Sequence, residues 1–275
     1  MDTAAATTTN AEISRRLDFD AVVIGAGVTG LYLLYKLREL GLRVRTLEAA
    51  SGVGGTWYWN RYPGARFDSE SWTYGYAWSQ KLLDTWDWSE HFASQPETER
   101  YLNHVADAFD LRRHIQFNTR VTAARYREDT RSWEIVAQDG GRYTTRFLLT
   151  AIGVLSAPTM PNNIPGIDSF KGQSFHTHHW PREGVDYAGK RVGIIGTGAT
   201  AVQAIQEIAK TAARLTVFQR NPNWCVPQHN GRISKEEMRD IRARYPEILA
   251  LCRTTPSCYI HGPCLLYTSP SPRDS

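Results

Sequence analysis

The chain has no long apolar run. Its 275 residues are 41% hydrophobic, yet no stretch approaches the roughly 20 consecutive apolar residues that a membrane helix needs. The first 17 residues, in which 3–9 are only Thr and Ala, also lack the apolar centre of a secretory signal. We therefore expect residues 1–17 to be a disordered lead, and we expect no membrane partner.

Cysteine is scarce and confined to the second half of the chain. No two cysteines have the close spacing of a metal-ligand pair, and nothing indicates export. The sequence therefore predicts free thiols in a cytoplasmic protein. His178 and His179 lie near His176, but no carboxylate or cysteine completes a ligand set, so we expect no metal site. The four cysteines are Cys225, Cys252, Cys258 and Cys264.

A strong charge of one sign is also absent. The formal net charge is +4, and Lys and Arg are spread along the chain without a dense basic stripe. Nucleic acid is therefore not an expected partner. Length and composition fit one large domain or two smaller ones.

A strand, a glycine loop, a helix and a second strand follow one another near the start. Residues 19–24 are a short apolar run typical of a buried parallel strand. Residues 31–40 have leucines along one side of a helix, and Gly41 is placed where a helix C-terminal glycine belongs. Residues 44–47 form the second strand, so the sequence predicts a β-turn-α-β unit.

The first glycine loop has the pattern Gly25-x-Gly27-x-x-Gly30. The first glycine permits a tight turn, the second lets the backbone approach a pyrophosphate, and the third allows close helix–strand packing. The pyrophosphate would lie against the helix N-terminus, beside Thr29, where free N–H groups favour an anion. Glu48 ends the second strand and would accept hydrogen bonds from ribose hydroxyls. We predict dinucleotide binding, and a structural glycine-rich turn is the alternative.

The second glycine loop has the pattern Gly196-x-Gly198-x-x-Ala201, in which Ala replaces the third Gly as this motif tolerates. The strand that follows ends in Gln219-Arg220, where an acid would mark NAD. A cation there suits the 2′-phosphate of NADP, and a solvated surface charge is the alternative. Two such loops predict two dinucleotides in one enzyme, and FAD with NADPH is the usual pairing.

The remaining periodicity predicts an α/β fold with two dinucleotide-binding, Rossmann-like domains. A further helix is expected over 97–111, and further strands over 115–121, 133–136, 146–151, 191–195 and 215–218, with a turn at 139–141. The last residues have no periodicity and resemble translated adapter sequence. The expected division is a disordered lead at 1–17, an incomplete FAD-binding domain at 18–155, a linker at 156–189, an incomplete NADP-binding domain at 190–232, the start of a helical insertion at 233–259 and an artefactual tail at 260–275.

Two longer motifs carry a family resemblance. The loop from Gly54-Gly55-Thr56-Trp57 through Pro63-Gly64 to Asp68 resembles a signature of type I Baeyer–Villiger monooxygenases. The second motif matches that family's fingerprint between the two glycine loops. It consists of Phe170, Gly172, His176, Trp180 and Pro181. The related flavin-containing monooxygenases that oxidise nitrogen and sulfur typically end this string in Tyr or Phe, so Trp180-Pro181 favours ketone oxygenation.

The resemblance implies an activity and two cofactors. Such enzymes use NADPH, FAD and O₂, and a peroxide of the reduced flavin inserts one oxygen atom next to a ketone carbonyl to give an ester or lactone. The resemblance also implies that a C-terminal half is missing here. Two alternatives stay open: an N- or S-oxygenating flavin-containing monooxygenase, and a non-catalytic fragment that binds nucleotide. The expected partners are a ketone and O₂, and the oligomeric state is open.

The resemblance further assigns site residues. Asp68 would hold a catalytic arginine that lies beyond residue 275, and Arg66 would contact the nicotinamide cofactor. His176 would act as a hinge between the domains, or be only a polar link. The FAD-side positions are Gly55, Thr56, Trp57, Asp68, Tyr74 and Val121, with core packing as the alternative for Val121. The NADP-side positions are Gly196, Thr197, Gly198, Ala199, Thr200, Ala201, Gln203, Arg220 and Asn221.

Overall fold

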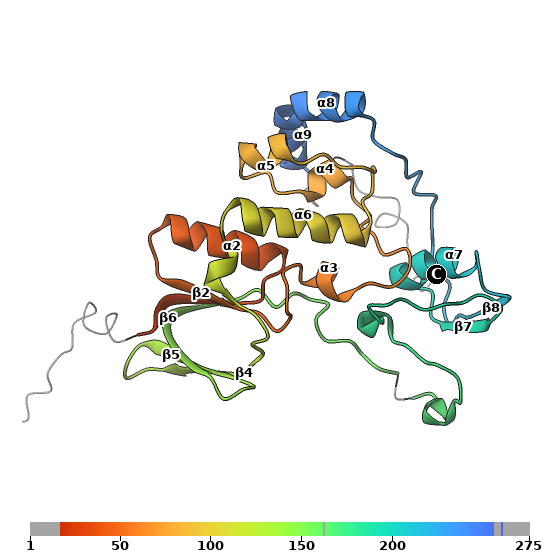
Figure 1. Ribbon diagram of the computed structural model, residues 1–275, viewed down its shortest axis with the longest axis horizontal. Coiled ribbons are helices and arrows are strands. Elements are labelled where there is room, and N and C mark those ends of the chain that lie inside the picture. Colours follow the sequence, from red (N-terminus) through yellow and green to blue (C-terminus); the bar gives the residue numbers. More distant parts are fainter. Residues whose placement is uncertain (1–16, 162, 256–259, 261–275) are drawn as a thin grey trace, which may run out of the picture. The chain divides into compact units, whose positions relative to one another are not determined.

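The computed structural model describes residues 17–161, 163–255 and 260, and it is an α/β protein (Figure 1). Residues 1–16 of the expected lead, and all of the expected tail except residue 260, lie outside these residues. Leu17 was expected to belong to the disordered lead, but it is buried, and its carbonyl oxygen accepts a hydrogen bond from the Arg43 guanidinium. The ordered chain therefore begins at least one residue earlier than expected.

The chain forms two compact units. Unit 1 is drawn from Met1–Trp59 and Glu99–His176, and unit 2 from Asn60–Thr98 and Thr177–Ser275. Residues 60–98 therefore fold with unit 2, although they fall inside the expected FAD-binding domain at 18–155. The boundaries of the two cofactor domains stay a prediction.

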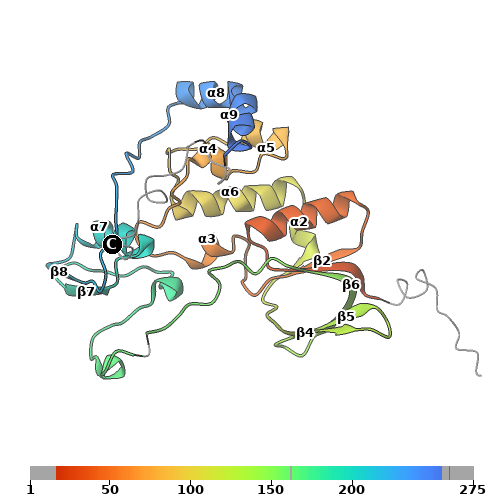
Figure 2. The same ribbon diagram turned by 180° about the vertical axis from the view of Figure 1, so that it is seen from behind.

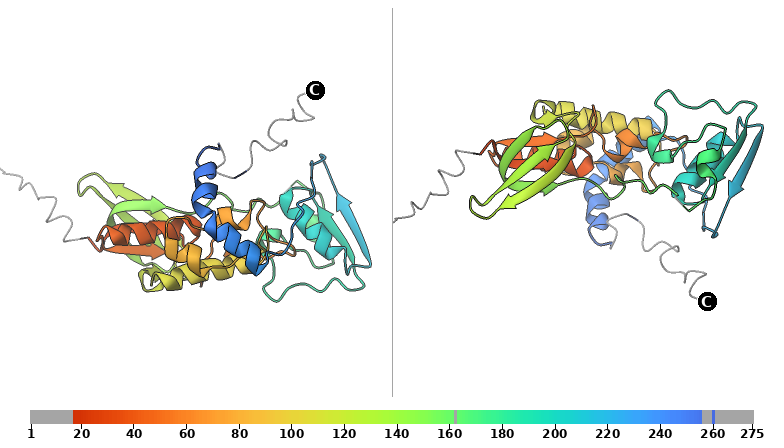
Figure 3. Two further views of the ribbon diagram at one scale, coloured as in Figure 1. Left: turned by 90° about the horizontal axis from the view of Figure 1, so that it is seen from above. Right: turned by 90° about the horizontal axis from the view of Figure 1, so that it is seen from below.

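Unit 1 is built on a six-stranded sheet in the order β3-β2-β1-β6-β5-β4. Strand β1 pairs in parallel with β2 and β6, β2 pairs in parallel with β3, and β4, β5 and β6 are antiparallel. Figures 1 and 3 show α2 over one face of the parallel strands and the β4–β5 ribbon on the other side. Its elements are β1 (Phe19–Ile24), α2 (Val28–Glu39), β2 (Val44–Leu47), α3 (Thr56–Trp59), η1 (Arg112–His114), β3 (Ile115–Gln116), β4 (Val121–Arg127), β5 (Ser132–Ala137), β6 (Arg142–Thr150) and η2 (Ile167–Ser169). Helix α6 (Gln95–Ala108) begins in a unit 2 segment and continues into unit 1.

The core of unit 1 lies between the parallel strands and the antiparallel ribbon. Val22, Leu47 and Ile135 are fully buried there, and Val121 packs against them. Removing this apolar surface from water supplies the main driving force for the unit. On α2, Leu31 and Leu34 are buried, but Leu40 is 73% exposed. The expected leucine stripe therefore ends before the last of its four members, because α2 ends at Glu39.

Several expected elements have different bounds in the structure, among them the helix expected over 97–111, which runs from Gln95 to Ala108. The strand expected over 115–121 is wrong as one strand: β3 ends at Gln116 and β4 begins at Val121. Asn118 between them has a positive φ of 54°, which extended backbone does not adopt. Helix α2 starts at Val28, three residues earlier than expected, because the third glycine of the loop is already helical. Strand β6 begins at Arg142, four residues before the expected start.

Unit 2 contains a short parallel pair and several helices. Strands β7 and β8 pair in parallel with Arg191 opposite Arg214. The helix-prone stretch at 233–251 forms two helices, α8 and α9, which lie beside α4 and α5 (Figure 2). Ser234 caps α8 by accepting a hydrogen bond from the Glu237 N–H, and Pro246 in the first turn of α9 separates the two helices. The elements of unit 2 are α4 (Ser71–Tyr74), α5 (Gln80–Thr85), η3 (Thr177–His179), β7 (Arg191–Ile195), α7 (Ala199–Ile208), β8 (Arg214–Phe218), α8 (Lys235–Ala243) and α9 (Tyr245–Cys252).

Candidate functional site

The first glycine loop of unit 1 has no space for side chains at two of its glycines. A Cβ atom at Gly25, where φ is +101°, would lie 2.5 Å from the carbonyl oxygen of Ala151. A Cβ atom at Gly30 would overlap the carbonyl oxygen of Gly25. The turn after β1 is thus packed against the residue that follows β6 at Gly25 and against the first turn of α2 at Gly30, so only glycine fits at these two positions.

The structure brings a second glycine segment against this loop. Gly55 has a φ of +55°, and a Cβ atom there would lie 2.8 Å from the Cα atom of Gly27. The Gly54 N–H donates a hydrogen bond to the Ala26 carbonyl at 3.1 Å. The two segments that the sequence assigned to one cofactor therefore form one backbone cradle. At the start of α3 that follows, Thr56 is exposed and Trp57 is buried.

Glu48 stabilises the first glycine loop through hydrogen bonds to the backbone. Its buried carboxylate accepts a hydrogen bond from the Ala26 N–H at 2.6 Å through Oε2, and one from the Ala50 N–H at 2.7 Å through Oε1. Each carboxylate oxygen can accept more than one hydrogen bond. Glu48 can therefore hold the loop and still accept from a ribose hydroxyl.

Two further residues expected on the FAD side have structural contacts. Val121 packs against the unit 1 core, as the alternative interpretation had it. Tyr74 belongs to unit 2, where its ring stacks on Phe67 at a centroid distance of 4.3 Å. These contacts explain both residues as packing, and their contact with a cofactor stays a prediction.

The second glycine loop, in unit 2, is open by comparison. A Cβ atom at Gly196 or Gly198 would meet nothing within 4 Å among the described residues, although φ at Gly196 is +104°. The loop is tied to the segment after β8, since the Asn223 side chain donates to the Thr197 carbonyl at 2.8 Å. Arg220 in that segment is exposed, as are Asn221 and the Ala199 that starts α7.

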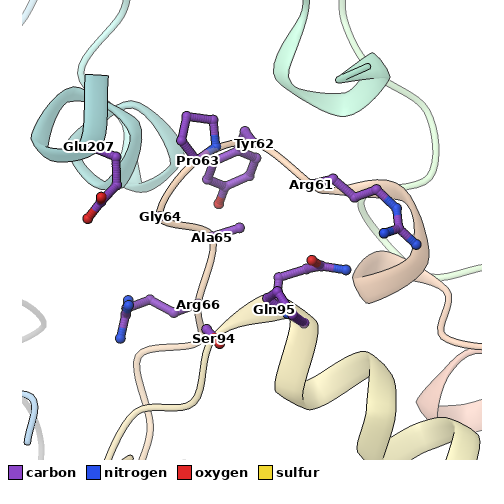
Figure 4. A pocket seen from close by; sticks show the side chains of 10 residues that line it. Arg61, Tyr62, Pro63, Gly64, Ala65, Arg66, Ser94, Gln95 and Glu207 are labelled. Atoms are coloured by element: carbon purple, nitrogen blue, oxygen red, sulfur yellow. The ribbon is translucent and has the colours of Figure 1, made fainter. Parts of the chain in front are cut away.

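The signature loop of unit 2 borders a pocket of about 350 Å³. Figure 4 shows the loop with Glu207 of α7 on one side and Ser94 and Gln95 on another. The lining residues are Arg61, Tyr62, Pro63, Gly64, Ala65, Arg66, Ser94, Gln95, Pro96 and Glu207. The pocket thus combines two guanidinium groups with one carboxylate and several backbone groups, which suits a polar ligand with an anionic part.

Arg66 has a protein partner that the sequence did not reveal. Its Nη1 lies 2.9 Å from Oε2 of Glu90 and 3.1 Å from the Phe92 carbonyl oxygen. Glu90 also accepts a hydrogen bond from Asn230 at 2.8 Å. These contacts fix the direction of the Arg66 side chain, and no local motif around Glu90 could have announced them.

Asp68 carries a carboxylate with no ionic partner. Within the described ranges, no side chain forms an ion pair or hydrogen bond with it, and it is exposed. The surrounding protein still desolvates it in part, which raises the pKa of the Asp68 carboxyl group above its ordinary value. An exposed carboxylate without a partner is suited to hold a cation supplied by another segment.

The fingerprint string spans the boundary between the units, which falls directly after His176. His176 is half-buried, and η3 follows it, while Phe170 is 65% exposed. No cluster of three metal-ligating side chains occurs in the part of the chain that the structure describes. Across the same residues, every helix is too short or too polar to span a bilayer.

Comparisons with known proteins agree with this geometry. The model of the family described as flavin-binding monooxygenase-like matches residues 20–238. Over 246 residues the chain is 54% identical to 2-oxo-Δ3-4,5,5-trimethylcyclopentenylacetyl-CoA monooxygenase of Pseudomonas putida, covering 87% of this chain and 45% of the relative. It is 46% identical over 241 residues to cyclohexanone 1,2-monooxygenase of an Acinetobacter species, covering 87% and 44%. It is also 45% identical over 231 residues to a phenazine N-monooxygenase of Lysobacter antibioticus, covering 84% and 42%.

Solved structures give the same result. A structure described as an OTEMO complex with FAD and NADP superposes with a TM-score of 0.85 at 54% identity, covering 89% of this chain and 47% of that chain. An oxidised steroid monooxygenase bound to NADP also gives a TM-score of 0.85, at 47% identity, covering 90% and 47%. The chain therefore spans less than half the length of the relatives that it matches.

The close packing at the first glycine loop predicts that an alanine there destabilises the protein more than an alanine in the second loop. Gly30→Ala should lower the free energy of unfolding by about 1–3 kcal/mol or more, because its Cβ atom must displace the backbone of Gly25. Gly198→Ala is the control, since a Cβ atom there meets nothing and φ is −67°. We expect it to change stability by less than about 0.5 kcal/mol. Urea unfolding of both variants checks this, and equal losses would contradict the steric account.

The raised pKa of Asp68 predicts that removing its charge stabilises the chain in a pH-dependent way. The fold disfavours the charged carboxylate, so this group lowers the free energy of unfolding above its folded-state pKa, and the effect vanishes below the unfolded value of about 3.9. Asp68→Asn should therefore stabilise the chain at pH 7, by less than about 1 kcal/mol because solvent reaches the group. The gain should disappear as the pH falls to about 3.5.

A second aspartate in the same unit provides the matched control. Asp87→Asn removes an ion pair with Arg242, so it should not stabilise the chain at pH 7. Thermal unfolding at both pH values separates the two variants. An Asp68→Asn variant that is less stable than the wild type at pH 7 would show that the carboxylate has a stabilising partner.

Proposed function

Because the chain belongs to the flavin-binding monooxygenase-like family, we propose that it is part of an FAD- and NADPH-dependent Baeyer–Villiger monooxygenase. Such an enzyme inserts one oxygen atom of O₂ next to a ketone carbonyl and releases an ester or lactone. The observation that carries the proposal is the backbone cradle of Gly25–Gly30 and Gly55 in a chain 46% identical to a cyclohexanone monooxygenase.

The cradle supports FAD as the cofactor of unit 1. Its glycines place no side chain at the start of α2, where the helix dipole favours a pyrophosphate. Glu48 would accept from the ribose, and Thr29, Thr56 and Trp57 would border the cofactor. When bound, FAD supplies the storage of two electrons and the reaction with O₂. The structures of relatives with FAD and NADP support the same assignment.

Unit 2 supports NADPH as the reductant. The loop Gly196–Ala201 would hold its pyrophosphate, and the exposed Arg220 with Asn221 would bind the 2′-phosphate. Arg66, held by Glu90, is a further cation for the same nucleotide. These assignments rest on the motif positions and on the exposure of Arg220 and Asn221.

Asp68 would act through the negative charge of its carboxylate. Its carboxylate would hold a guanidinium outside this chain, and that guanidinium would stabilise negative charge on the reacting oxygens. The absence of an ionic partner for Asp68 within the described residues supports this role. His176 would serve as the hinge, a role that its place at the unit boundary supports.

Oxygenation of nitrogen is the second candidate activity. The 45% identity to a phenazine N-monooxygenase favours keeping it, while relatives that act on cyclohexanone and acetone, the second at 50% identity, favour the ketone. The third interpretation, a nucleotide-binding fragment without catalysis, concerns this chain rather than the longer protein. The cytoplasmic location, the ketone and O₂ as partners and the domain boundaries stay predictions.

Product analysis distinguishes these activities. A longer protein that contains this chain, supplied with NADPH, O₂ and cyclohexanone, should form a lactone detectable by gas chromatography and mass spectrometry. Formation of N-oxides from an aromatic amine without any lactone would overturn the ketone proposal. The 275-residue chain should be yellow if unit 1 retains FAD, and it should form no lactone if it is only a fragment.

The proposed role of Arg220 predicts a change in nucleotide preference. Arg220→Ala should weaken NADPH binding about tenfold or more and leave NADH binding almost unchanged, because a charge-assisted hydrogen bond contributes roughly 1.5–3 kcal/mol. Arg214→Ala, at the exposed start of the same strand, is the control and should change neither affinity. Fluorescence titration of both nucleotides measures this, and equal losses for NADPH and NADH would count against a 2′-phosphate contact.

A further inference from the structure

Gln203 of helix α7 uses both ends of its side-chain amide within unit 2. Its Oε1 accepts a hydrogen bond from the Tyr62 hydroxyl at 2.9 Å and a longer one from the Arg66 N–H at 3.4 Å. Its Nε2 donates to the Arg66 carbonyl oxygen at 3.0 Å. The Gln203 side chain thus bonds to two residues of the signature loop: to the hydroxyl of Tyr62 and to the backbone of Arg66.

The loop also rests on the backbone of the same helix. Gly64 has a φ of +80°, and a Cβ atom there would lie 2.6 Å from the carbonyl oxygen of Gln203. Only glycine permits this approach. Backbone packing at Gly64 and the side-chain amide of Gln203 therefore both hold the loop against α7.

Tyr62 is suited to be the donor in this arrangement. Burial raises the pKa of its hydroxyl, and the negative charge of Asp68 raises it further, while Thr200 opposes the shift. The hydroxyl therefore stays protonated at neutral pH. Because that proton can point at Oε1, the amide of Gln203 is left in one orientation, with Nε2 toward Arg66.

We propose that Gln203 is a positioning residue that fixes the loop of residues 62–66, and through it Arg66 and Asp68, to helix α7. The sequence had grouped Gln203 with the residues that touch NADPH. Its amide bonds to Tyr62 and Arg66, and its contact with NADPH stays a prediction. The second glycine loop ends where α7 begins at Ala199, one turn before Gln203, so the contact makes these two loops one rigid piece. The identity of the ligand that both loops would contact, NADPH, rests on the proposed function.

Hydrogen exchange measured by mass spectrometry on the nucleotide-free 275-residue chain tests the contact directly. The Ala65 N–H, bonded to the Tyr62 carbonyl, and the Arg66 N–H report on the loop. Gln203→Ala should speed exchange at residues 62–68 by about tenfold or more, because it removes the three hydrogen bonds that the amide makes to this loop. Peptides from β1 and β2 in unit 1 should not change.

The chain offers a matched control on the same helix. Gln206 is also a glutamine of α7, but its side-chain amide bonds only to the Val202 carbonyl within its own helix. Gln206→Ala should leave exchange at residues 62–68 at the wild-type rate. Equal rates for Gln203→Ala and Gln206→Ala would overturn the proposal.

A conservative variant separates hydrogen bonding from simple packing. Gln203→Glu keeps an acceptor for the Tyr62 hydroxyl, but its carboxylate has no proton to give to the Arg66 carbonyl. Once corrected for the intrinsic rate, its exchange at 62–68 should exceed the wild-type rate at pH 7. It should return toward that rate as the pH falls through the ordinary carboxyl range near about 4.3, where a donor O–H forms.

This pH profile decides the proposal even if Gln203→Ala fails to fold. A packing role would give Gln203→Glu the same excess exchange at both pH values, and that result would overturn the proposal. Adding NADPH to the wild-type chain tests the proposed function apart from it. Slower exchange at 196–201 is expected, and its absence would count against NADPH binding without altering the nucleotide-free result.

Discussion

The contact on which the first cofactor cradle depends is an approach of backbone to backbone. Gly25 packs on the carbonyl oxygen of Ala151, and Gly30 at the start of α2 packs on the carbonyl oxygen of Gly25, so a methyl group at either position would displace a carbonyl oxygen. Gly55 packs on Gly27, where a Cβ atom would lie 2.8 Å from the Gly27 Cα atom. A pyrophosphate can be held by N–H groups only where no side chain covers them. The same absence of side chains that permits the packing would let a pyrophosphate approach the backbone of the loop.

Glu48 shows how one residue serves the fold and the site together. Its carboxylate ties the glycine loop to the end of β2 through two backbone N–H groups, and its burial makes those bonds costly to lose. At the second glycine loop, a Cβ atom on Gly196 or Gly198 would meet nothing within 4 Å among the described residues. The two loops therefore share a sequence pattern, but within these residues only the first is closely packed.

Local patterns predicted the parts of this molecule that depend on local forces. The strands at 19–24, 44–47 and 191–195 have the predicted bounds, since an apolar run between turn signals is enough to define a short strand. The prediction failed where one residue left the expected conformation, as Asn118 does at its positive φ between β3 and β4. It also missed the grouping of residues 60–98 with the second half of the chain, because no periodicity records which distant segments pack together.

The same limit explains why the roles of Gln203 and Arg66 were hidden. Gln203 stands in a glycine-loop helix, so its position indicated a nucleotide ligand, but its partners Tyr62 and Arg66 lie 141 and 137 residues earlier in the chain. Arg66 pairs with Glu90, which lies 24 residues later in a segment without a motif. A motif indicates which chemistry a loop can perform, whereas the contacts that aim the loop come from side chains outside it. For this chain, the backbone of Arg66 is held by the Gln203 amide on α7, and the guanidinium of Arg66 is held by the Glu90 carboxylate.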